Sequence, residues 1–126
     1  GAPAGGGVLI VGADDTEVSE NEIGDNNSFG VAVLGLESLF PGRGPFDVSA
    51  FPERTRVHGN QFSGNGGQAD KALLAADLKG ADLVWDATGG SNVWDEPDAT
   101  TAGLLLGERW PGFIRRAAFQ VLSRTR

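Results

Sequence analysis

Five side chains in this sequence have the chemistry that a catalytic site needs. Asp82 and Asp86 lie four residues apart at an apolar run, so both carboxylates can lie on one side of it. Arg54, Arg56 and His58 cluster earlier in the chain. Two or three carboxylates converging on a groove could hydrolyse a glycosidic bond, whereas a lyase would use a basic residue, often with Ca²⁺. Both reactions would act on a carbohydrate.

Structural roles account for these five side chains better than catalytic roles do. Arg54 and Arg56 are spaced as solvent-facing strand residues that alternate with inward-facing ones. His58 takes the position that Ser19 holds in an earlier copy of the same motif, and a single His cannot build a His-based zinc site. We therefore assign no catalytic residue and favour a non-catalytic chain, while the five side chains stay candidates.

Acidic clusters raise the separate question of Ca²⁺, which takes six to eight oxygen ligands. Such clusters occur at residues 14–15, 20–25 and 95–98. None matches an EF-hand loop or a glycine-rich nonapeptide repeat, and acids are common in turns for backbone reasons alone. The chain has no Cys, which excludes disulfides and thiolate metal sites. We predict no metal site and no cofactor.

Charge is distributed unevenly along the 126 residues, whose net charge is −7. Residues 1–107 hold 16 acids and 5 bases, whereas residues 108–126 hold one acid and five arginines. An acidic body argues against nucleic-acid binding, which needs clustered Lys and Arg on one face. No apolar run approaches the roughly 18 residues that a membrane-spanning helix needs.

One motif occurs twice, as T-x-V-x-x-N-x-[IF]-x-x-N at residues 16–26 and 55–65. An apolar run at residues 8–11 (VLIV) likewise recurs at 31–34 (VAVL). A third, partial unit begins near Ala81, with DLVW at 82–85 and NVW at 92–94. These units are too short to bury an apolar face alone, so we expect their strands to pair in parallel with their equivalents in the next unit.

The repeated positions predict columns of like residues. Stacked asparagines can hydrogen-bond amide to amide and tolerate left-handed corners. The expected amide columns are Asn21, Asn60 and Asn92, and Asn26 and Asn65; the expected apolar column is Ile23, Phe62 and Trp94. We interpret all of these as structural residues.

The sequence resembles right-handed parallel β-helix repeat proteins, in particular the C-terminal coils of bacterial members, which are usually exported. The resemblance lies in the repeated motif, the GVAV strand that follows it (30–33), and the later ADLVWD (81–86) and GSNVWD (90–95) segments. The resemblance implies an all-β solenoid of three to four coils over residues 8–98. Residues 1–7 would be a flexible lead-in or a truncated coil, and the Pro/Gly-rich residues 37–50 a protruding loop. It also implies a periplasmic or extracellular location.

Residues 99–126 form a C-terminal extension, with an apolar stripe that predicts an amphipathic basic helix. In a purely structural role, this helix would cover the last coil and its open sheet edge. In a binding role, it would contact a partner protein or an anionic membrane surface. Candidate partner-binding residues are Phe40, Phe46, Phe113, Arg115 and Arg116.

We predict a non-catalytic structural or binding module within a larger exported protein or assembly. Its partner would be another protein or missing N-terminal coils, with a glycan as a further possibility, and we expect no nucleic acid. The alternative is a fragment of a carbohydrate-active enzyme, namely a lyase, hydrolase or epimerase. Because the sequence starts at Gly1 without Met, we expect that further chain precedes it.

Overall fold

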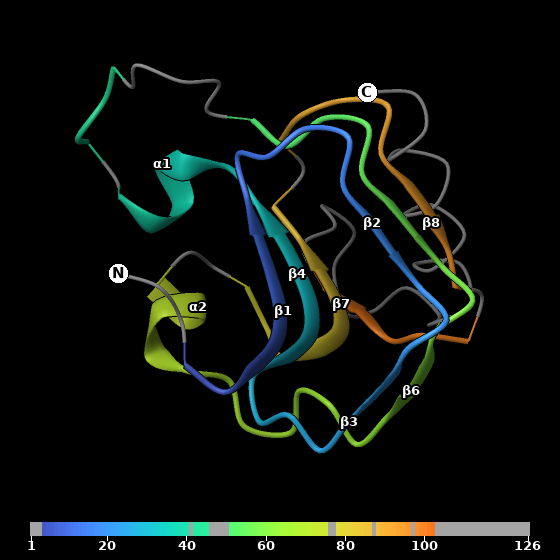
Figure 1. The fold of residues 1–126 in the computed structure, drawn as a ribbon. Helices are drawn as coiled ribbons and strands as arrows, with labels where there is room; N and C mark the ends of the chain where they lie inside the picture. The colour runs from blue at the N-terminus through green and yellow to red at the C-terminus, as the bar shows by residue number, and fades with distance from the viewer. Residues whose placement is uncertain are drawn as a thin grey trace, which may run out of the picture.

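The computed structural model describes residues 4–40, 42–45, 51–75, 78–86, 88–96 and 98–102. Figure 1 shows the strands and helices of these ranges: β1 Gly6–Val11, β2 Glu17–Ser19, β3 Glu22–Gly24, β4 Phe29–Leu34, α1 Leu36–Leu39, β5 Arg56–His58, β6 Gln61–Ser63, α2 Lys71–Ala75, β7 Ala81–Trp85, β8 Val93–Asp95 and β9 Thr101–Ala102.

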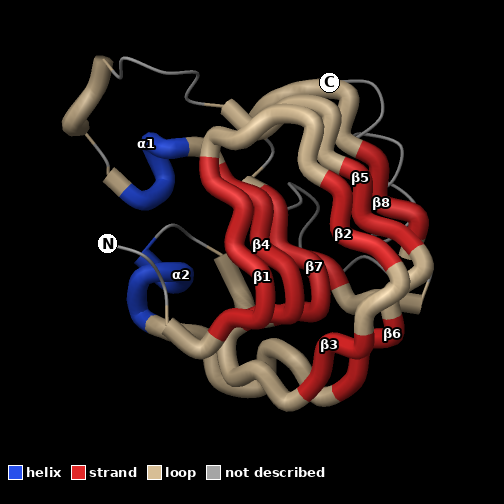
Figure 2. The backbone as a smooth tube through the Cα atoms, viewed as in Figure 1, coloured by secondary structure: helices blue, strands red, loops and turns tan. Residues whose placement is uncertain are grey.

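The strands form three small parallel sheets. Their orders are β1-β4-β7-β9, β2-β5-β8 and β3-β6. In its first two passages the chain visits the three sheets in turn, and each strand of the second passage pairs with its equivalent in the first (Figure 2). In the third passage β7 and β8 extend the first two sheets, and β9 then extends the first sheet again. The first passage therefore supplies the edge strands β1, β2 and β3.

Strand register follows the sequence repeat in the first two passages. Val8 pairs with Val31, Val18 with Val57 and Ile23 with Phe62. Corner residues with positive φ separate the short strands: Asp15, Glu20 and Asp25 are matched 39 positions later by Arg54, Gly59 and Gly64. The repeated motif thus encodes three-residue strands bounded by left-handed corners, which glycine and short polar residues adopt most readily.

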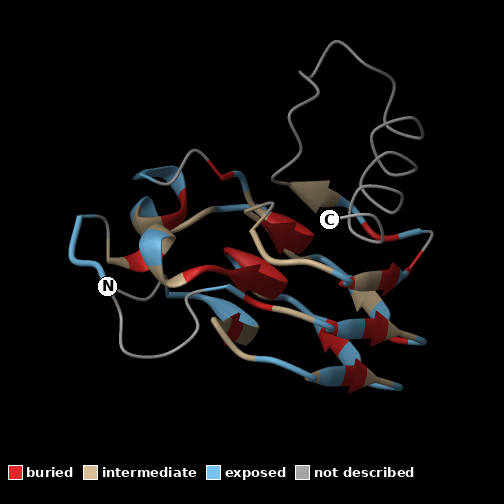
Figure 3. Cartoon of the chain, turned by 90° about the horizontal axis from the view of Figure 1, so that it is seen from above, coloured by how far each residue is buried: buried red, intermediate tan, exposed pale blue. Residues whose placement is uncertain are grey.

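Apolar side chains cover both faces of the four-stranded sheet. One face joins the other two sheets in a core that includes Val31, Leu83, Trp85 and Trp94. On the other face Phe29, Leu34 and Val84 belong to a second cluster, which includes Leu39 of α1 and Leu73 of α2. The central strands β4 and β7 are buried throughout, whereas the edge strand β1 is partly exposed (Figure 3).

Both helices were absent from the sequence prediction. Helix α1 lies at the start of the segment predicted as a loop, residues 37–50. Helix α2 follows Asp70, whose Oδ2 accepts the Ala72 N–H at 3.1 Å in the manner of an N-cap. Its residue Leu73 is buried against the four-stranded sheet.

The predicted fold class, an all-β right-handed parallel β-helix of three to four coils, is wrong. The strands form separate small parallel sheets that are not curled into a solenoid, and two helices contribute to the second apolar cluster. The repeat specifies which strands pair, but pairing alone does not determine how sheets curl. The predicted C-terminal helix lies outside the described residues. Within them, no helix has the length and apolar character to cross a membrane.

Candidate functional site

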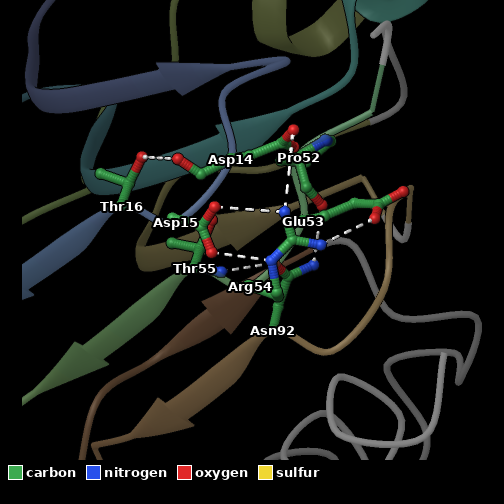
Figure 4. A network of polar contacts seen from close by, with 8 residues as sticks. All are labelled: Asp14, Asp15, Thr16, Pro52, Glu53, Arg54, Thr55 and Asn92. Carbon is green, nitrogen blue, oxygen red and sulfur yellow. Dashed lines mark hydrogen bonds and ion pairs between the residues drawn. The ribbon is translucent and has the colours of Figure 1, made fainter.

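Arg54 is the centre of an ion-pair cluster at the corners that precede β2 and β5. Its Nε donates to Asp15 Oδ1 at 2.7 Å and its second terminal nitrogen to Asp15 Oδ2 at 3.2 Å (Figure 4). Glu53 Oε2 lies 3.4 Å and Asp14 Oδ2 3.9 Å from guanidinium nitrogens. The backbone bonds Asp15 N to Glu53 O and Glu53 N to Ala13 O hold the two corners side by side.

The ion pair between Arg54 and Asp15 stabilises the charged form of both side chains, as the directions of their pKa shifts show. The hydrogen bond from Arg54 lowers the pKa of the Asp15 carboxyl. The same hydrogen bond, followed by the charge of Asp15, raises the pKa of the Arg54 guanidinium. A general base at neutral pH requires a lowered guanidinium pKa, so Arg54 is not prepared to abstract a proton.

Arg56 and His58 meet at one carboxylate on the neighbouring strand. Glu17 Oε2 lies 3.2 Å from Arg56 Nη1 and 3.2 Å from His58 Nε2. β2 and β5 place Glu17 directly beside Arg56, and the strand alternation brings His58 to the same face. These side chains are partly or largely exposed, so their contacts are those of a solvated strand face.

Asp82 and Asp86 bind different groups. Asp82 is buried in β7, where its Oδ1 accepts from Asn65 Nδ2 at 3.0 Å and its Oδ2 from the Thr100 N–H at 2.9 Å. Asp86 follows the end of β7, and the hydrogen bonds among the described residues give the two carboxylates no common partner. The expectation that they face one groove therefore has no geometric support.

Asp86 joins two segments through four hydrogen bonds. Its Oδ2 accepts from Gly35 N at 2.8 Å and from Ser38 Oγ at 2.5 Å, at the N-terminus of α1. Its Oδ1 accepts from Thr88 N at 3.1 Å and from Thr88 Oγ1 at 2.5 Å. Asp86 thus accepts the N–H of the N-cap residue Gly35, a hydrogen bond that an N3 carboxylate makes in a capping box.

One asparagine column lies at the corners that follow β2, β5 and β8. Asn21 donates its backbone N–H and its Nδ2 to Asn60 Oδ1, at 2.9 and 3.1 Å. Asn60 in turn donates its own N–H and Nδ2 to Glu96 Oε1, at 2.8 and 2.9 Å. Glu96 is buried and was not predicted for this column; a carboxylate only accepts, so the donations end on it.

A second column has the same construction. Asn26 donates its N–H and Nδ2 to Asn65 Oδ1, at 3.2 and 3.0 Å, and Asn65 Nδ2 donates to Asp82. Both columns therefore run in one direction, from the first passage of the chain to the third, and both end on a carboxylate. Asp82 thus has a structural partner set rather than an open coordination site.

The structure places two residues of the predicted columns elsewhere. Asn92 lies beside Thr55, whose N–H it accepts at 3.0 Å, and not beside Asn60. Trp94 pairs with Val57 rather than with Phe62. The third passage aligns with the second at an offset of 37 residues instead of 39, and this shift moves both residues to a different position.

Of the five partner-binding candidates, Phe40 alone lies within the described residues. Phe40 is half-buried against the second apolar cluster beside α1. Phe46, Phe113, Arg115 and Arg116 lie outside the described residues. Across the described ranges, no group of three or more His, Asp or Glu side chains has a geometry that could hold a metal ion.

Comparisons with protein-family models, curated proteins and solved structures found no match for this chain. The resemblance to β-helix repeat proteins therefore stays a prediction from sequence, and its fold component is the part that the structure corrects.

Proposed function

We propose that this protein is a non-catalytic structural or binding module that works through contacts with a protein partner in a larger assembly. The observation that carries the proposal is the placement of the five catalytic candidates. They fall into separate networks, in which Arg54 contacts Asp15, Arg56 and His58 contact Glu17, and the two aspartates bind backbone and amide groups.

The alternative, a fragment of a carbohydrate-active enzyme, needs carboxylates that converge on substrate. Asp82 does not favour the enzyme alternative, because both of its carboxylate oxygens accept structural hydrogen bonds. Asp86 likewise accepts two hydrogen bonds on each oxygen. A location outside the cytoplasm is part of the proposal and rests on the sequence resemblance alone.

Purification from the native source under non-denaturing conditions tests this function. We expect the protein to elute in a complex larger than one chain, with a polypeptide, identical or different, in stoichiometric amount. The proposal is overturned if the chain elutes alone and degrades a polysaccharide with an activity that Asp82→Asn abolishes in a folded variant.

A further inference from the structure

We propose that the outer edge of β1, β2 and β3, here called the open edge, binds the arginine-rich segment 103–126 of a second copy of this chain. Copies would then associate head to tail. This inference rests on the proposed function and names the surface and the partner for it.

No strand of the described ranges pairs with the outer side of the open edge. In the part of the chain that the structure describes, β1, β2 and β3 each pair with one strand, namely β4, β5 and β6. The three strands follow one another between residues 6 and 24, and their outer borders lie on the same side of the three sheets (Figure 2). Unpaired strand borders of this kind recruit other chains.

The side chains along the open edge are acidic. Residues 4–34 contain six acids and no Lys, Arg or His. All six are exposed: Asp14, Asp15, Glu17, Glu20, Glu22 and Asp25. The first three meet Arg54, Arg56 or His58, whereas the ion pairs found among the described residues do not involve the last three.

The two asparagine columns leave acceptors at the same edge. Asn21 and Asn26 donate toward the second passage, as Asn60 and Asn65 donate toward the third. By the same geometry, the Oδ1 atoms of Asn21 and Asn26 are positioned to accept from a further layer, and no hydrogen bond reaches them within the described ranges. The edge thus offers acceptors and negative charge, which a guanidinium, with five donors and no acceptor, complements.

The chain itself contains a segment of this chemistry. Residues 103–126 hold five arginines and one acid. They continue from β9, which lies at the opposite edge of the four-stranded sheet from β1. Two open edges cannot face each other because their acids repel. A head-to-tail contact joins unlike surfaces and can propagate from copy to copy.

A competing interpretation is that the acids only keep strand borders of different copies apart, as charged residues do on many sheet edges. The two interpretations predict opposite signs. If the acids attract the arginine segment, Glu20→Gln/Glu22→Gln weakens association. If they only repel other copies, the same variant associates more strongly than the wild type.

Sedimentation velocity of the full chain over a concentration series provides the measurement. We expect concentration-dependent association that weakens about tenfold or more when NaCl rises from about 0.02 M to about 0.5 M, because salt screens exposed charges. Glu22→Lys on β3 should weaken association about tenfold, whereas the matched exchange Glu37→Lys on α1 should leave it unchanged. Glu22 and Glu37 are both exposed, which favours folded variants; circular dichroism checks this.

A mixing experiment identifies the partner segment. Glu20→Lys/Glu22→Lys reverses the charge of two of the six edge acids, and Arg115→Glu/Arg116→Glu reverses the charge of two of the five segment arginines, so neither variant should associate alone. Mixed, they should form a 1:1 dimer that grows no further, because one intact edge meets one intact segment.

A monomeric wild type at low salt, a stronger association of the glutamine variant, or two variants that fail to combine would each overturn the inference. An edge occupied by the same copy's segment would give the first of these results. The proposed function would survive any of them if the native preparation contains a different stoichiometric polypeptide.

Discussion

Substitution of Asp86 provides a direct test of whether this carboxylate is structural. Asp86→Ala removes the acceptor for four donors: the Gly35 N–H, the Ser38 hydroxyl, and the N–H and hydroxyl of Thr88. Asp86→Asn keeps one oxygen but turns an NH₂ group toward two of these donors. Both variants therefore loosen the connection between the end of β7 and the start of α1.

The magnitude follows from the number and kind of hydrogen bonds. A hydrogen bond to a charged group contributes about 1.5–3 kcal/mol, and an unsatisfied buried donor costs about 1–3 kcal/mol. Asp86 is half-buried and the two hydroxyls can turn toward water, so the sum over four bonds is an upper limit. We expect Asp86→Asn to lower the free energy of unfolding by about 2 kcal/mol and Asp86→Ala by about 3–4 kcal/mol.

Urea denaturation followed by tryptophan fluorescence measures this loss. Trp85 is buried beside the network and donates its Nε1–H to the Thr88 carbonyl at 2.7 Å, so its emission reports on the region. Asp95→Ala is the control, because it removes an exposed carboxylate from β8 and should change stability by less than about 0.5 kcal/mol. If Asp86→Ala is as stable as this control, the structural assignment of Asp86 is refuted.

Three further predictions concern other parts of the molecule. Asn60→Leu removes the Nδ2 donor of the buried Glu96 carboxylate and keeps only the backbone N–H of residue 60, so it should lower the free energy of unfolding by about 1.5–3 kcal/mol, measured by urea denaturation; a loss below about 1 kcal/mol contradicts the column. Because Asp15 has a folded pKa below its ordinary value of 3.8, its stabilising contribution is complete above that value and is lost as pH falls through the folded pKa. The difference in Tm between the wild type and Arg54→Gln should therefore narrow as pH is lowered through the acid range, and a constant difference would contradict this. Leu83→Ala should cost about 2–5 kcal/mol in thermal or urea unfolding because Leu83 is fully buried in the core, and a neutral effect would contradict that packing.

The sequence predicted strand pairing well where the repeat is intact. Val18 and Val57 hold the same motif position and pair in the structure, as do Ile23 and Phe62. The amide column from Asn21 to Asn60 follows from the same match. In these passages the spacing of left-handed corners, at Asp15 and its equivalent 39 residues later, keeps the register constant.

The third passage could not be predicted in the same way because its motif has diverged. Glu96 replaces an asparagine as the end of one column, and nothing local in the sequence marks a buried glutamate. Asn92 was assigned by its similarity to Asn60, but the 37-residue offset places it beside Thr55. The prediction that the sheets curl into a solenoid was wrong for a different reason. The curl of a sheet depends on how the sheets pack together, and the repeat carries no information on that packing.

The most direct test of a protein partner at the open edge is amide hydrogen exchange across residues 6–24, which contain β1, β2 and β3. We expect these amides to exchange slowly in the native assembly and much faster once the chain is released as a monomer at high salt. Residues 29–34 of β4, which is paired on both sides, serve as the reference and should stay protected in both states. Equal exchange of residues 6–24 in the two states would contradict a partner at this edge.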